Sequence, residues 1–209
     1  MAKLYFRYGA MNSGKTTALL QVAYNYEERG QHVALAKPAT DTKGARHMVS
    51  RLGVEREVDF LIHPADDVLD VFRRFAAGKE GGTLIEKPRP LDALLIDEAQ
   101  FLTARQVDDL MRIALLDNVP VLTYGIRTDF QTVAFPGARR LLEIAHTLEE
   151  LKTICVCGRK AIFNARKVGG HFIFDGDQVA IDGTDATYES LCGNCYLQES
   201  SGQLSPTSS

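Results

Sequence analysis

The sequence has no large excess of either charge, no long apolar run and no cysteine before residue 155. Its 24 basic and 27 acidic side chains leave a net charge of −3, so it lacks the overall basic field that holds a nucleic acid. No stretch is apolar enough to cross a bilayer, and the N-terminus lacks the apolar core of a secretory signal. We therefore expect a cytoplasmic protein that binds neither nucleic acid nor membrane.

The 4 cysteines form two pairs, Cys155 with Cys157 and Cys192 with Cys195. In a reducing compartment such clustering favours a metal over disulfides. Two pairs supply four thiolates for one tetrahedral Zn2+, and a site closed by four protein ligands is structural rather than catalytic. The C-x-C spacing of the first pair is tighter than C-x-x-C and weakens the signal, so free or partly buried thiols are the alternative.

Eight residues near the start match the phosphate-binding pattern G-x-x-x-x-G-K-[ST]. They are Gly9, Ala10, Met11, Asn12, Ser13, Gly14, Lys15 and Thr16. A glycine at each end lets the backbone curl with its N–H groups inward, where they and the start of the next helix cradle phosphate oxygens. Lys15 is expected to reach the outer phosphates, and Thr16 to hold Mg2+ through its hydroxyl. A glycine turn with an incidental lysine is the alternative.

Predicted strands and helices alternate over the first 150 residues, which is typical of an α/β fold with a mostly parallel sheet. We expect strands at 4–8, 32–36, 58–62, 91–96, 119–124 and between 146 and 153, and helices at 17–29, 65–77, from a capping box at 103–106 and from 136. The stretches 37–56 and 78–90 are expected to be loops. The predicted organisation is a P-loop, RecA-like domain over 1–150, a zinc-binding domain over 151–198 and a disordered tail over 199–209.

Polar residues follow two of the predicted strands. Asp97 and Glu98 come directly after Ile96, where Asp97 would hold the Mg2+ shell through water. Glu98 would deprotonate an incoming hydroxyl or orient an attacking water, unless both carboxylates are merely solvated. Arg127 follows the strand ending at Tyr124, and either offsets charge on a transferring phosphoryl group or is a surface arginine.

Two aromatic residues, Phe130 and Tyr188, fall in predicted loops rather than in periodic elements. They would either line a planar ligand or simply pack.

Together, the loop at 9–16, Asp97-Glu98-Ala99-Gln100-Phe101 and the stretch 124–130 resemble the zinc-containing thymidine kinases of bacteria and the animal cytosol. The runs 157–161 and 188–192 extend the resemblance, which covers residues 3 to about 197. It implies transfer of the ATP γ-phosphate to the 5′-hydroxyl of thymidine, giving dTMP and ADP. Family members are usually homotetramers that the end product dTTP inhibits.

The resemblance also implies roles for single residues. Glu98 matches the general base, and Lys15, Thr16 and Asp97 match residues that serve the phosphates and Mg2+. Gln100, Asp41, Lys43 and the rest of the loop at 9–16 complete the expected nucleotide-binding set. Met11, Ile126 and Phe130 match positions around the thymine, and Tyr188 belongs to a lasso loop, between the cysteine pairs, that closes over the base.

Two departures stand out. The C-x-C spacing puts the ligand role of Cys155 in doubt more than that of Cys157. Lys43 stands where arginine is commoner, and a lysine cannot form the two parallel hydrogen bonds of a guanidinium group.

Two other classes of protein remain alternatives on the residues alone. One is an ATP-driven nucleic-acid motor, in which Glu98 polarises water and the zinc segment attaches to the nucleic acid. Low net charge and the lack of basic clustering after residue 150 argue against it, because such binding needs phosphate neutralisation. The other is a nucleotide-sensing regulatory protein whose zinc segment contacts a partner.

Overall fold

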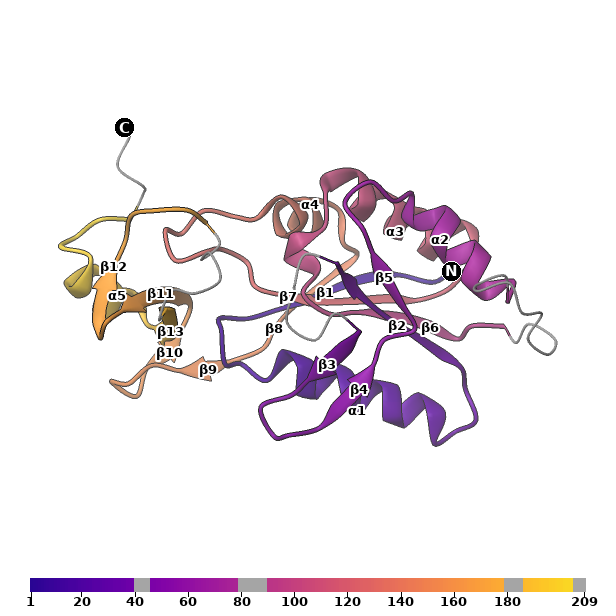
Figure 1. The fold of residues 1–209 in the computed structure, drawn as a ribbon, viewed down its shortest axis with the longest axis horizontal. Coiled ribbons are helices and arrows are strands. Elements are labelled where there is room, and N and C mark those ends of the chain that lie inside the picture. Colours follow the sequence, from indigo (N-terminus) through magenta and orange to yellow (C-terminus); the bar gives the residue numbers. More distant parts are fainter. Residues whose placement is uncertain (40–45, 79–89, 179–185, 205–209) are drawn as a thin grey trace.

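The computed structural model describes residues 1–39, 46–78, 90–178 and 186–204. A parallel sheet of six strands, in the order β5–β2–β6–β7–β1–β8, runs through the larger part of the molecule (Figure 1). Its strands are β1 Leu4–Tyr8, β2 Val33–Pro38, β5 Phe60–Ile62, β6 Ala93–Ile96, β7 Val121–Gly125 and β8 Thr147–Glu150. The expected α/β sheet is thus confirmed, and all of its neighbouring strands are parallel.

Helices connect the strands, because a parallel pair needs a crossover rather than a hairpin. They are α1 Lys15–Glu27, α2 Val68–Ala76, α3 Ala104–Leu116 and α4 Pro136–Ile144, with a 3-10 turn, η1, at Ala99–Phe101. The predicted capping box is present: Thr103 and Gln106 each accept a hydrogen bond from the other's backbone N–H at the start of α3. No helix among the described residues is long and apolar enough to cross a membrane.

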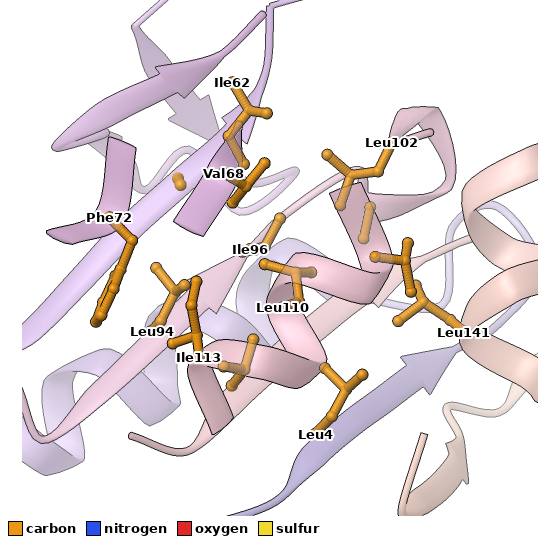
Figure 2. Packing of buried hydrophobic residues seen from close by; sticks show 14 of the residues in the cluster. Leu4, Ile62, Val68, Phe72, Leu94, Ile96, Leu102, Leu110, Ile113 and Leu141 are labelled. Atoms are coloured by element: carbon orange, nitrogen blue, oxygen red, sulfur yellow. The ribbon is translucent and has the colours of Figure 1, made fainter. Parts of the chain in front are cut away.

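The two faces of the sheet bury separate sets of side chains. Alternate residues of β6 point to opposite faces, so Leu94 and Ile96 pack against α2, α3 and α4, whereas Leu95 packs on the α1 side. Figure 2 shows the first set, in which Val68 and Leu110 come from the covering helices. Because both faces are covered, β2 is buried along its whole length, as its apolar run Val33–Ala36 predicts, and the burial extends to Lys37 and Pro38.

The expectation of a loop over 37–56 is wrong in part. Lys37 and Pro38 extend β2, and β3 (His47–Val49) pairs with β4 (Glu55–Glu57) in an antiparallel hairpin. Met48 is buried in the core on the α1 side, and Arg56 forms an ion pair with Glu27 of α1. The hairpin forms because it packs on the end of α1, a tertiary contact that its polar sequence does not predict. Of the other expected loop, residues 79–89 lie outside the described residues.

The chain after β8 folds as a separate small unit at the carboxyl end of the sheet, which we call the cysteine module (residues 153–204; Figure 1). It contains a short hairpin, a three-stranded antiparallel sheet and one helix: β9 Thr153–Ile154, β10 Lys160–Ala161, β11 Phe163–Val168, β12 His171–Ile173, β13 Ala186–Leu191 and α5 Gly193–Glu199. Tyr188 therefore lies in a strand, not in the expected loop, because β13 pairs with β11 along its length.

The expectation of disorder from residue 199 is wrong for the described residues up to 204. Glu199 ends α5, Ser200 is buried, and the carbonyl of Leu204 accepts a hydrogen bond from Thr132. This segment packs on the body of the protein, which its serine-rich composition does not predict.

A substitution in the central core tests the packing of α3 on the sheet. Leu110 on α3 is fully buried, and we expect Leu110→Ala to lower the free energy of unfolding by about 2–5 kcal/mol through lost burial and the cavity left behind. Leu116→Ala is the control, since Leu116 lies on the same helix and is 68% exposed. Urea unfolding followed by circular dichroism measures both changes, and similar values for the two variants would contradict the packing described.

Candidate active site

The phosphate-binding loop joins β1 to α1, as expected, and both of its glycines are required. A Cβ on Gly9 would come within 2.5 Å of the Leu151 carbonyl oxygen and of Ser13 Oγ. Gly14 has φ of 74°, a left-handed conformation that side chains disfavour. The loop can therefore curl against the end of β8 only with glycine at these two positions.

Lys15 is buried inside this loop. Its Nζ donates to the carbonyl oxygens of Gly9 at 3.3 Å and Ala10 at 2.9 Å. Burial lowers the pKa of Lys15, and the charges of Glu98 and Asp97 oppose that shift. The loop thus holds its ammonium group in a poorly solvated place, where a charge acts more strongly on a neighbouring anion.

Thr16 and Asp97 meet beside the loop. Thr16 Oγ1 donates to Asp97 Oδ2 at 2.8 Å, and Asp97 Oδ1 accepts from the backbone N–H of Glu98 at 3.0 Å. Burial, followed by the nearby charge of Glu98, raises the pKa of Asp97 to about 7. A hydroxyl and a carboxylate are oxygen donors of the kind that Mg2+ takes, so the pair fits the ion predicted for it.

Glu98 is held by its neighbours in an unusual backbone conformation, with φ of 51°. The side-chain amide of Gln100 donates to Glu98 Oε2, and Gln100 Oε1 accepts from the backbone N–H of Ile126 at 3.2 Å. Gln100, expected from the family resemblance to bind nucleotide, is 1% exposed and has both ends of its amide engaged by protein groups. It orients Glu98 relative to the segment after β7.

These groups border one large cavity of about 1190 Å³ between the loop, η1 and the cysteine module. The expected site residues that line it are Met11, Asn12, Gly14, Lys15, Thr16, Glu98, Gln100, Ile126, Phe130 and Tyr188. Asp97 lies behind Thr16. Asp41 and Lys43 fall outside the described residues.

Arg127 does not line this cavity. Its guanidinium lies over the ring of Tyr8, 6.0 Å from the ring centroid, and it borders a separate small hollow with Gly9 and Ala10. This position favours the interpretation of Arg127 as a surface arginine over a role at a transferring phosphoryl group.

Other residues at the cavity carry no local signal in the sequence. Arg166 is buried with its guanidinium 3.7 Å from the centroid of the Phe130 ring, and its Nε donates to the Tyr188 hydroxyl at 3.0 Å. It braces two of the predicted substrate-binding aromatics at once. Arg166 contacts these lining residues without lining the cavity itself, whereas Arg51, in the turn of the β3–β4 hairpin, does line it. Both depend on how distant strands pack, so no motif marks them.

The four cysteines converge in the cysteine module. Their sulfur atoms all lie within 4.8 Å of one another, and none forms a disulfide. Four thiolates at about 2.3 Å from a central Zn2+ make the tetrahedral arrangement of structural sites, and this cluster fits it. Cys155 belongs to the cluster despite the C-x-C spacing, in a turn where the N–H of Gly158 donates to the Cys155 carbonyl at 2.8 Å.

Comparison with known proteins extends over nearly the whole chain. A family model described as thymidine kinase matches residues 2–196. The chain is 48% identical to the thymidine kinase of Idiomarina loihiensis over 194 residues, covering 92% of this chain and 94% of that protein. It is 44% identical to the thymidine kinase of Chromobacterium violaceum over 198 residues, covering 94% and 98%. The region that the family model matches includes the loop at 9–16 and all four cysteines.

The cysteine cluster predicts a metal content that can be measured. We expect about one zinc per chain in the purified protein and a large loss in Cys157→Ser, because a hydroxyl is a poor ligand in place of a thiolate. The matched control is Val156→Ser at the neighbouring position, which is 76% exposed and should keep the metal. Elemental analysis by mass spectrometry measures both, and equal zinc in the two variants would rule out the cluster as the site.

Burial of Asp97 predicts a cost to stability. Its folded pKa of about 7 exceeds its usual value, so stability falls as the pH rises from that usual value through about 7 and the buried group ionises. In magnesium-free buffer at about pH 8 we expect the melting temperature of Asp97→Asn to be no lower than that of the wild type. At about pH 5 we expect the melting temperature of the wild type to rise relative to that of the variant. Thermal denaturation tests this, and a variant much less stable at both pH values contradicts it.

Proposed function

The chain belongs to the thymidine kinase family, and from this membership and the geometry of its cavity we propose how it phosphorylates thymidine. One observation carries the proposal. Glu98 lines the same cavity as Lys15 and Thr16 of the phosphate-binding loop and as the apolar side chains of Met11 and Ile126. A base, a phosphate site and an apolar wall in one cavity suit transfer of a phosphoryl group from ATP to a nucleoside hydroxyl.

The loop at 9–16 binds the phosphates of ATP in this proposal. Its N–H groups and the N-terminus of α1 supply fixed dipoles, and Lys15 supplies a full positive charge. Thr16 and Asp97 hold Mg2+, which when bound neutralises charge on the phosphate oxygens. Lys15 donates hydrogen bonds to loop carbonyls in this structure and would donate them to phosphate oxygens in the nucleotide complex. Asp41 and Lys43, in the undescribed segment, complete this half of the site on the basis of the family resemblance.

Glu98 is the general base that takes the proton of the 5′-hydroxyl as that oxygen attacks the γ-phosphorus. Its carboxylate is held in place by Gln100, so little reorganisation precedes proton transfer. Such a base contributes about 10²–10⁴ in rate. Gln100 acts here as a positioning residue rather than as a nucleotide ligand.

The nucleoside occupies the side of the cavity nearer the cysteine module. Met11, Ile126, Phe130 and Tyr188 form apolar and aromatic walls for a planar base. Arg166 fixes the spacing of Phe130 and Tyr188, since it stacks on one ring and hydrogen-bonds the hydroxyl of the other. A base held between these walls also excludes water, which would otherwise hydrolyse the γ-phosphate.

The proposal extends to cofactors, regulation and assembly. The reaction uses ATP with Mg2+, and Zn2+ in the cysteine cluster is structural. The end product dTTP inhibits the enzyme, because its thymine and its triphosphate together fit both halves of the cavity. The enzyme acts in the cytoplasm as a homotetramer, as the family resemblance implies.

Glu98→Gln tests the assigned base. We expect turnover to fall by about 10²–10⁴ with ATP binding retained, because the amide keeps the shape and the Gln100 contact but cannot accept the proton. The control is Glu143→Gln on α4, which should match the wild type. The assay follows dTMP formation with ATP, Mg2+ and thymidine, together with binding of a fluorescent ATP analogue. Unchanged turnover would remove Glu98 from the mechanism.

A further inference from the structure

Met11, the third residue of the phosphate-binding loop, has both of its backbone polar groups bound by the cysteine module. Its N–H donates to Asn164 Oδ1 at 2.7 Å, and its carbonyl accepts a hydrogen bond from Ser190 Oγ. The two side chains belong to β11 and β13, far from the loop in sequence. The peptide groups on both sides of Met11 are thus oriented by the module.

Asn164 also reaches the opposite wall of the cavity. Its Nδ2 donates to the carbonyl of Thr128, in the segment after β7, at 2.9 Å. The side chain is 2% exposed, and its amide oxygen and nitrogen are both engaged. One buried amide therefore ties the loop to the segment that carries Ile126 and Phe130.

The same two residues stand close to the metal cluster. Asn164 and Ser190 are direct cross-strand partners in the β11–β13 pair. Ser190 is followed along the chain by Leu191 and Cys192, and both Leu191 and Cys192 are buried in the core of the module. A change in the position of Cys192 on metal loss would therefore reach Ser190 through Leu191, the last residue of the paired strand β13.

We propose that Asn164 and Ser190 are positioning residues that fix Met11 of the phosphate-binding loop to the cysteine module, so that metal binding and substrate binding reinforce each other. The proposal rests on the proposed function, since it takes the cavity to be the site of both substrates. It assigns the metal a role beyond the stability of its own module.

The physical basis is preorganisation. The N–H of Met11 is committed to Asn164, so this donor does not serve the phosphates, and the loop curls around a fixed point. The same contacts fix the backbone of Met11, whose side chain lines the cavity. Ordering the loop before substrates arrive removes an entropic cost of binding. Coupling between two sites is reciprocal, so bound substrates must in turn retain the metal more tightly.

Kinetics of Asn164→Ala and Ser190→Ala give the first test. We expect the KM values for ATP and thymidine to rise about tenfold, with zinc content unchanged, because a part-buried backbone group of Met11 loses its hydrogen-bond partner. Ser190→Thr keeps the hydroxyl and should restore wild-type KM values. Glu189→Gln, at the adjacent position of β13, alters the Lys167 ion pair and does not contact the loop, so it serves as the control.

A purely structural role predicts a different result. Loss of folded protein lowers the active fraction and leaves the KM values of the remaining enzyme unchanged, and that outcome in both Ala variants would overturn the proposal. Ser190→Ala removes a single hydroxyl and provides the test if Asn164→Ala is too unstable to purify. A wild-type enzyme that makes no dTMP would instead refute the proposed function.

Release of zinc gives a second test that does not depend on activity. The rate is followed by the absorbance of a pyridylazo chelator, with and without thymidine plus a non-hydrolysable ATP analogue. We expect the substrates to slow release several-fold from the wild type and to have little effect on the Asn164→Ala, Ser190→Ala double variant. Equal slowing in both proteins, or none in the wild type, would overturn the coupling.

Discussion

The hydrogen bond between Thr16 and Asp97 is the contact on which the rest of the site depends. Thr16 lies in the first turn of α1, which follows β1, and Asp97 follows β6, with β7 lying between these two strands in the sheet. Since all three strands are parallel, their carboxyl ends meet at one edge. The contact closes that edge and sets the phosphate-binding loop beside Glu98. A different strand order would separate the loop at 9–16 from Glu98, whatever motifs the chain carried.

This edge also concentrates features that oppose folding. Lys15 and Asp97 are ionisable and buried, and Glu98 has a positive φ, so each lowers stability in the absence of ligand. The surrounding fold offsets the cost with contacts that take no part in the chemistry, such as the apolar layers on both faces of the sheet. In the proposed function, the phosphates of ATP and Mg2+ bring charges that pair with Lys15 and Asp97. The residues at this edge therefore lower the stability of the free protein, and ligand binding raises it again.

The sequence predicts well what is decided locally. The phosphate-binding loop, the capping box at Thr103 and the pair Asp97–Glu98 depend on neighbouring residues and a strand context, and the structure confirms their placement. What the sequence did not reveal is decided by pairing across the chain. The β3–β4 hairpin exists because Met48 finds a core, and Tyr188 lies in a strand because β11 pairs with it. No motif in the sequence marks Asn164 or Arg166 for the same reason, since the groups that they contact lie on other elements.

The chain divides into two parts near residue 150, but both parts contribute to the same cavity. The module contributes Tyr188 to the cavity wall, Arg166 to the spacing of its aromatics and Asn164 to the orientation of the loop. Its own core is small, so cross-linking by a metal is the physical means by which such a unit becomes rigid. A rigid module is what the site requires, because hydrogen bonds to Met11 can orient the loop only if the groups that make them are themselves fixed. In our proposal the cysteines therefore act on the cavity through the backbone of Met11.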